Sequence, residues 1–389
     1  MPESLKALYI EALHLTQFRN YAEANLRFCR GINCLVGANG SGKTNLLDAI
    51  HFLAFTRGFR SSQDKMAMKD GEDFFFNGGT LYRQGVKQEV YVNFAKGKGK
   101  KVLVNQKPVE KMSDHIGKIP LVSVLPGDTD LINGAAAERR KFLDMLISQY
   151  DPVYLRHLIA YERIISQRNA QLRLFSETGR FDREQLEIWN SQLIPHGIKI
   201  FEGRHRFLEE FMPLFEAFFR KIVSEKETPS IRYRSQIEAN SPSEWAQRLT
   251  QSEDKDRVLL YSGTGIHRDD LSFRIDEYSA RNYGSQGQQK TFVIALKLAQ
   301  YRLLEQQTGV PPVLLLDDIF DKLDEQRLRS IASLLDQEVA GQIFMTDTSY
   351  GRLSVAFADV SQREIAYFEV ENGTVQPLII SDTGKPEAP

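Results

Sequence analysis

One stretch limits what this chain can fold into more than any other. Residues 37–44 fit the pattern G-x-x-x-x-G-K-[ST] at every fixed position. The apolar run 31–36 before it predicts a buried strand, and residues 45–53 after it show helical spacing of apolar side chains. Strand, glycine-rich loop and helix are the context that a phosphate-binding loop needs, because loop N–H groups and the helix dipole then face one anion. A chance glycine-rich turn is the alternative, and both flanks disfavour it. The expected nucleotide-binding residues are Gly37, Ala38, Asn39, Gly40, Ser41, Gly42, Lys43, Thr44 and Asn45.

This motif assigns chemistry to individual side chains. Lys43 is expected to reach the outer phosphates of ATP, and the Thr44 hydroxyl to hold Mg²⁺. A second apolar run, 313–316, ends in two carboxylates, and a buried unpaired charge is costly unless it has a task. Asp317 is therefore predicted to orient Mg²⁺, and Asp318 to activate the water that attacks the γ-phosphate.

A serine-glycine segment precedes another predicted helix. Ser285, Gly287 and Gln288 lie in residues 285–289, where backbone donors and a helix dipole make a second anion site. Since one loop already serves the γ-phosphate within the chain, the second site suits the nucleotide of another subunit. This predicts a head-to-tail dimer with two ATP molecules at its interface. The alternative is an ordinary helix cap.

Composition bounds the remaining possibilities. The 389 residues carry a net charge of −1, so a nucleic-acid site must be a local patch. Two cysteines, Cys29 and Cys34, have no metal-ligand spacing and suggest a reducing cytosol. The sequence shows no membrane-spanning run and no signal peptide, so we expect a cytoplasmic protein.

The order of predicted elements indicates an α/β fold with an inserted helical lobe. The strands expected at 7–15 and 26–29 lead into the strand before the loop, which predicts a mixed sheet that is partly antiparallel at its start. Residues 73–109 alternate in short runs and predict an antiparallel meander. Residues 150–257 have helical period, interrupted by Pro195, and the stripe Phe207, Phe211, Phe215 and Phe218 is expected in the core. The expected division is 1–148 and 258–380 for the ATPase lobe, 149–257 for the helical lobe and 381–389 for a tail.

Basic residues gather in two places. One set follows the first helix and the other occupies a turn of the meander, where a phosphate-contacting tip and a soluble protective loop are equally compatible readings. Adjacent arginines, Arg139 and Arg140, suit a solvated helix face or an anion site. The candidate DNA-binding residues are Arg57, Arg60, Lys65, Lys98 and Lys100.

Several segments together resemble the ABC-type ATPases and, within them, the RecF family, which is similar to the heads of structural-maintenance-of-chromosomes proteins. The resemblance runs from about residue 13 to 348. Gly127, Ala136, Ile266 and Asp321 depart from the usual family residues, while the strand tip Thr346-Asp347 is nearer RecF than the histidine of transporters. The segments concerned are 15–21, which includes Asn20 as a further nucleotide-binding candidate, 126–144, 266–271, 285–289 and 314–324.

The resemblance implies a function. It indicates an ATP-dependent dimer and weak ATPase that binds single- and double-stranded DNA at gaps or junctions in repair and replication. With RecO and RecR, it helps to load the recombinase. Three alternatives stand beside this: a transporter ATPase subunit, the ATPase of an overcoming-lysogenisation-type nuclease, and an ATP-gated structural clamp with incidental hydrolysis.

Overall fold

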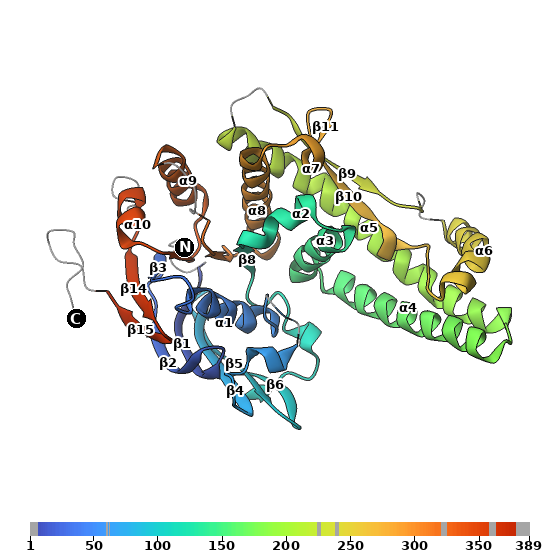
Figure 1. Ribbon diagram of the computed structural model, residues 1–389, viewed down its shortest axis with the longest axis horizontal. Coiled ribbons are helices and arrows are strands. Elements are labelled where there is room, and N and C mark those ends of the chain that lie inside the picture. Colours follow the sequence, from blue (N-terminus) through green and yellow to red (C-terminus); the bar gives the residue numbers. More distant parts are fainter. Residues whose placement is uncertain are drawn as a thin grey trace. The chain divides into compact units, whose positions relative to one another are not determined.

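The computed structural model describes residues 7–59, 61, 63–223, 227–237, 241–319, 325–357 and 363–378. They form two compact units, one of residues 1–128 with 297–389 and one of residues 129–296. Within the described residues, no helix combines the length and apolar character needed to cross a membrane. Each unit has its own sheets and helices, and Figure 1 shows both.

The first unit contains two six-stranded sheets. One is antiparallel, with strand order β2-β1-β4-β5-β6-β7, and the other has the order β15-β14-β3-β13-β12-β8. Antiparallel strands are β1 Leu8–Phe18, β2 Tyr21–Arg27, β4 Phe74–Arg83, β5 Val86–Ala95, β6 Gly99–Val104 and β7 Lys107–Pro108. The second sheet contains β3 Ile32–Val36, β8 Leu121–Val124, β12 Val313–Leu316, β13 Ile343–Asp347, β14 Ile365–Glu371 and β15 Thr374–Pro377. The helices of the first unit are α1 Lys43–Phe55, α9 Glu325–Glu338 and α10 Tyr350–Phe357. It also contains the one-turn helices η2 Asp64–Ala67, η3 Met112–Asp114 and η4 Pro126–Thr129.

Helix α1 is buried between these sheets. It contacts β1, β4 and β5 of one sheet and β8 and β13 of the other. Almost every residue of α1 is buried, as expected for a helix that is apolar on all sides. The antiparallel sheet approaches it closely, because a Cβ at Gly79 would lie 2.3 Å from Leu53, and Asn77 Nδ2 donates to Ala49 O at 2.8 Å. The start of α1 is thereby fixed relative to both sheets.

The expected mixed sheet is present, but the strands expected to form its antiparallel part, at 7–15 and 26–29, do not belong to it. Strand β3 pairs in parallel with β13 and β14, and β15 is the antiparallel member. Strands β1 and β2 instead join the predicted meander, because β1 pairs with β4 along most of its length. Alternating patterns identify a strand but not its partner, which only the tertiary structure selects.

The second unit is mainly helical. Helices α4 and α5 pack along each other, and α6 contacts both (Figure 1). A three-stranded sheet has the order β11-β10-β9. The helices are α2 Asp130–Asn133, α3 Ala136–Tyr150, α4 Pro152–Thr178, α5 Arg183–Ile222, α6 Pro242–Leu259 and α7 Ala280–Tyr283, with η5 Ile266–Arg268. The strands are β9 Pro229–Arg234, β10 Asp270–Ile275 and β11 Tyr278–Ser279, and α8 Gln286–Thr308 runs on into the first unit.

The sequence predicts that Pro195 interrupts the helical segment, but the structure shows no interruption there. Helix α5 continues through Pro195 and Pro213 over 40 residues. An internal proline removes one backbone hydrogen bond, but buried neighbours such as Leu193 and Ile198 keep the helix packed. The phenylalanine stripe from Phe207 to Phe218 is buried, which confirms its predicted place in the core.

The two units divide the chain at positions other than those expected. Residues 129–148 and 258–296 belong to the helical unit, because α3 packs against α4, α5 and β10, and β10 pairs with β9. Arg139 is buried and makes a bidentate pair with Asp270, and Arg140 donates to Asp269 O at 2.7 Å. The paired arginines therefore hold this unit together, and both expected roles, solvated face and anion site, are wrong for Arg139.

A second buried network reinforces the same unit. Arg204 makes a bidentate pair with Asp144 at 2.9 and 3.0 Å and reaches Asp269 Oδ2 at 3.2 Å. Arg168 and Asp256, both with fully buried side chains, pair at 2.8 Å. Buried charges need such partners, because an unpaired one carries the full cost of desolvation.

Candidate nucleotide site

The glycine-rich loop lies at the carboxyl end of β3 and leads directly into α1. Gly40 and Gly42 have φ values of 82° and 121°, which side chains rarely adopt. A Cβ at Gly42 would lie 2.5 Å from Asn20 Nδ2 and 2.7 Å from the Tyr21 hydroxyl. Glycine is required here by both the backbone conformation and the close approach of these side chains.

Two side chains from the β1–β2 connection support the loop. Asn20 Nδ2 donates to Ser41 O at 3.1 Å, and the Tyr21 hydroxyl donates to Gly42 O at 3.0 Å. Asn45 Nδ2 donates to Asn20 Oδ1 at 2.7 Å, so two predicted nucleotide-binding residues contact each other. Tyr21 was missed from sequence, and burial raises the pKa of its hydroxyl well above the ordinary value. It therefore stays a neutral donor to the loop.

Lys43 and Ser41 make the loop a candidate anion site. The Lys43 side chain is buried, and Nζ donates to the carbonyl oxygens of Gly37 at 2.7 Å and Ala38 at 3.0 Å. Ser41 Oγ is buried and has no hydrogen-bond partner within the described residues. Carbonyl dipoles compensate only part of a buried positive charge, and an orphaned hydroxyl needs a partner. A phosphate group would satisfy both.

The predicted metal ligands are brought together from distant parts of the chain. Thr44 Oγ1 donates to Asp317 Oδ1 at 2.9 Å, and Asp317 is buried at the end of β12. Among the described residues, no group of three or more His, Cys, Asp or Glu side chains could hold a metal ion. One hydroxyl and one carboxylate fit Mg²⁺, which binds through few protein ligands and keeps phosphate oxygens and waters for the rest.

Asp318 lies beside this pair in an unusual conformation. Its φ is 46°, in the left-handed region. Its N–H donates to Thr346 Oγ1 at 2.9 Å, and the same hydroxyl donates to Asp317 Oδ1 at 2.9 Å. The sequence marks Thr346 only as part of a strand tip that resembles the RecF family, and its spacing from Asp317 gives no signal of this contact.

The serine-glycine segment, in the second unit, forms a reciprocal helix cap. Gln288 N donates to Ser285 Oγ at 3.2 Å, and Ser285 N donates to Gln288 Oε1 at 2.8 Å. Gln288 Nε2 also donates to Glu227 Oε1 at 2.9 Å, while Gly287 is half-buried in the first turn of α8. Ser285 and Gln288 therefore cap the start of α8. The cap satisfies only part of the free N–H groups at a helix start, and the second anion site stays a prediction.

The two predicted basic sets meet in the structure. Lys100 Nζ donates to Thr56 O at 2.8 Å and pairs with Asp64 at 2.9 Å, which ties the meander turn to the segment after α1. Arg57, Lys65 and Lys98 are exposed. Lys100 therefore connects two segments of the chain and is not a free tip of the turn. Arg60 and Asp321 lie outside the described residues.

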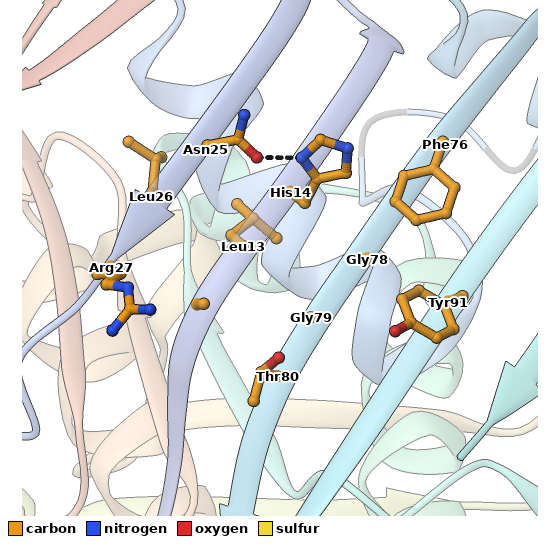
Figure 2. Close-up of a pocket in the computed structure, with 11 residues that line it drawn as sticks. Leu13, His14, Asn25, Leu26, Arg27, Phe76, Gly78, Gly79, Thr80 and Tyr91 are labelled. Atoms are coloured by element: carbon orange, nitrogen blue, oxygen red, sulfur yellow. Dashed lines mark hydrogen bonds between the residues drawn. The ribbon is translucent and has the colours of Figure 1, made fainter. Parts of the chain in front are cut away.

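A hollow on the antiparallel sheet is separate from all of these residues. Figure 2 shows it on the sheet face, with His14, Asn25, Phe76 and Tyr91 pointing out of the strands. A Cβ at Gly78 would lie 2.8 Å from Phe76 and 2.9 Å from Tyr91, so these rings cover the glycine. No predicted site residue lines the hollow, and we assign it no part in the chemistry.

Comparisons with known proteins identify similar chains. The model of the RecF/RecN/SMC N-terminal domain family matches residues 9–375. The DNA replication and repair protein RecF of Flavobacterium johnsoniae is 43% identical over 341 residues, covering 88% of this chain and 94% of that protein. RecF of Porphyromonas gingivalis strain ATCC 33277 is 41% identical over 370 residues, covering 95% of this chain and 100% of that protein.

Solved structures give the same result. A structure described as the recombination mediator protein RecF–ATP in the RecFOR pathway has a TM-score of 0.88 and 30% identity, covering 97% of this chain and 100% of the other. An Smc head domain from Pyrococcus furiosus has a TM-score of 0.56 and 16% identity, covering 96% of each chain. The second likeness concerns the fold alone.

We expect Lys43→Ala to weaken ATP binding at least about tenfold, because a charge-assisted contact to phosphate contributes roughly 1.5–3 kcal/mol. A direct titration with ATP measures this, and Lys199→Ala, which removes an exposed lysine of the helical unit, is the control. Unchanged affinity in Lys43→Ala would remove the phosphate assignment.

The two carboxylates are expected to separate by function. Asp318→Asn should retain ATP while turnover falls about a hundredfold or more, in the range of a lost general base. Asp317→Asn should chiefly weaken Mg²⁺-dependent nucleotide binding. Turnover and affinity measured on both variants test this assignment, and parental turnover in both would show that the pair is structural.

Proposed function

The chain belongs to the RecF family of ABC-type ATPases, and from that premise we propose that it is an ATP-dependent DNA-binding protein of recombinational repair and replication maintenance. The observation that carries the proposal is the contact between Thr44 and Asp317, which joins the phosphate loop to the acidic strand end. Together with the anion preference of Lys43 and Ser41, it gives one site suited to a nucleotide triphosphate with Mg²⁺.

In this proposal, different groups of the site bind the phosphates, hold the metal ion and activate the water. The loop N–H groups and Lys43 bind the phosphates, and Thr44 and Asp317 would hold Mg²⁺, which neutralises developing negative charge. Asp318 lies next to Asp317 and would orient the attacking water and accept its proton. We propose that this site alone makes a weak ATPase, which DNA stimulates and which further groups complete.

We infer that completion comes from a second copy. The capped start of α8 offers backbone donors and a helix dipole to an anion, and it belongs to the unit that does not contain the loop. A head-to-tail homodimer would bring Ser285 and Gly287 of each copy to the γ-phosphate of the other. ATP binding then controls assembly.

DNA binding would follow assembly. Arg57, Lys65 and Lys98 are exposed on the part of the chain that Lys100 ties together, and two copies would double the number of phosphates met. Contacts of this kind go to the DNA backbone, so preference for gaps or junctions would come from shape. The relative solved with ATP is described within the RecFOR pathway, and we propose RecO and RecR as partners here, acting in the cytoplasm at the nucleoid.

Family membership decides against two alternatives named above, the transporter subunit and the overcoming-lysogenisation-type nuclease. The ATP-gated structural clamp remains, because it uses the same residues and differs only in the rate of hydrolysis. Turnover measured with and without gapped DNA separates the two: stimulation by DNA supports the ATPase switch, and a DNA-independent trace of hydrolysis supports the clamp.

We expect Ser285→Arg to leave ATP binding by the monomer nearly intact and to block ATP-dependent dimerisation, since a large cation would occupy the anion site. Light scattering with ATP measures assembly. Ser191→Arg places the same side chain on an exposed position of α5 and serves as the control. Normal dimers of Ser285→Arg would refute the role of this segment in assembly.

Binding to duplex DNA is expected to depend more steeply on salt in the presence of a non-hydrolysable ATP analogue. Each neutralised phosphate adds roughly −0.9 to the slope of log affinity against log salt, so about four new contacts steepen it by about 3.6. Lys98 and Lys101 are exposed lysines of the meander turn, and the Lys98→Gln, Lys101→Gln double variant should lose part of this increase. The control is the Lys141→Gln, Lys255→Gln double variant, which removes exposed lysines of α3 and α6 and should retain it. Equal slopes with and without the analogue would contradict the proposal.

A further inference from the structure

A single hydroxyl joins the two carboxylates of the site. Strands β12 and β13 are parallel, with Leu316 opposite Met345. Asp317 follows Leu316 and Thr346 follows Met345, so these two residues come next to each other. Thr346 is completely buried. Its Oγ1 accepts from the Asp318 N–H at 2.9 Å and donates to Asp317 Oδ1 at 2.9 Å, while Asp318 Oδ1 lies 3.3 Å away.

This contact holds a strained backbone. Asp318 adopts a φ of 46°, and a left-handed conformation at a residue other than glycine is strained and persists only where its surroundings impose it. The bond from Asp318 N–H to Thr346 spans 28 residues of sequence, so the neighbouring strand imposes the conformation. The turn of the chain immediately after Asp317 therefore depends on Thr346.

The same hydroxyl keeps Asp317 oriented when Thr44 is otherwise engaged. Thr44 and Thr346 both donate to Asp317 Oδ1, each at 2.9 Å. If the Thr44 hydroxyl binds a metal ion, its hydrogen bond to Asp317 is weakened or lost. The Thr346 hydroxyl lies between the two acids and keeps its hydrogen bond to Asp317. Resting on the proposed ATPase function, we propose that Thr346 is a positioning residue that holds Asp317 and Asp318 in their separate roles, metal side and water side.

Packing does not require a hydroxyl at this place. The preceding residues of β13, Ile343, Phe344 and Met345, are buried and apolar, and valine has the shape and strand preference of threonine. Thr346→Val should therefore retain the strand while removing the acceptor for Asp318 N–H and the donor to Asp317. Thr346→Ser retains both and is the matched control.

We expect Thr346→Val to lower kcat at least about tenfold with the affinity for ATP changed less than about threefold, because misplaced catalytic groups affect the reaction more than binding. Thr346→Ser should stay within about threefold of the parent. Hydrogen exchange of the Asp318 amide in the nucleotide-free full chain gives a readout independent of activity: it should accelerate in Thr346→Val and remain slow in Thr346→Ser. Thr346→Ala provides a second variant without the hydroxyl should the valine variant fold poorly.

A double variant shows whether Thr346 acts through Asp318. In the Asp318→Asn background, Thr346→Val should reduce kcat little further, because residues that act as a unit are not additive. If Asp318→Asn is slow but Thr346→Val and Thr346→Ala each keep the parental kcat, the role of Thr346 is overturned and the role of Asp318 stands. Parental kcat in Asp318→Asn would instead overturn the proposed role of Asp318 in hydrolysis, and the role of Thr346 with it.

Discussion

The burial of α1 between two sheets is the constraint on which the candidate nucleotide site depends. The helix contacts strands of both sheets along its length, so its first residue cannot shift without disturbing the core of the unit. That first residue is Lys43, and the loop before it is held from the side by Asn20 and Tyr21. A phosphate site built this way is organised before any ligand arrives, which lowers the entropy lost on binding.

The acidic half of the site is fixed by strand order. Asp317 follows β12, and β13 lies between β12 and β3 in the sheet. The loop after β3, the tip of β13 and the acids after β12 therefore share one sheet edge, where ligands of open α/β sheets commonly bind. Thr346 comes from the middle strand of these three, which explains why it, rather than a residue nearer in sequence, contacts both acids.

The helical unit uses a different principle, buried ion pairs. Arg204 with Asp144, Arg168 with Asp256 and Arg139 with Asp270 join helices and β10 to one another. Burial, together with the positive charges of Arg268, Arg140 and Arg168, also lowers the pKa of His267 to about 4, so this side chain is neutral near pH 7. Such pairs hold specific elements together because breaking one leaves a costly uncompensated charge.

The sequence alone determined the features whose physics is local. The loop glycines, the strand before them, the acids that end an apolar run and the Ser285–Gln288 box are all readable from a few consecutive residues, because backbone conformation and capping act over such distances. Only the tertiary structure decided that β1 and β2 join the meander, that α5 continues through Pro195, and that Lys100 binds Asp64. It also decided that Thr346 binds both acids and that Arg139 binds Asp270, across 131 residues. Strand partners, buried ion pairs and shared hydroxyls depend on which distant segments pack together, and no local pattern in one sequence specifies that choice.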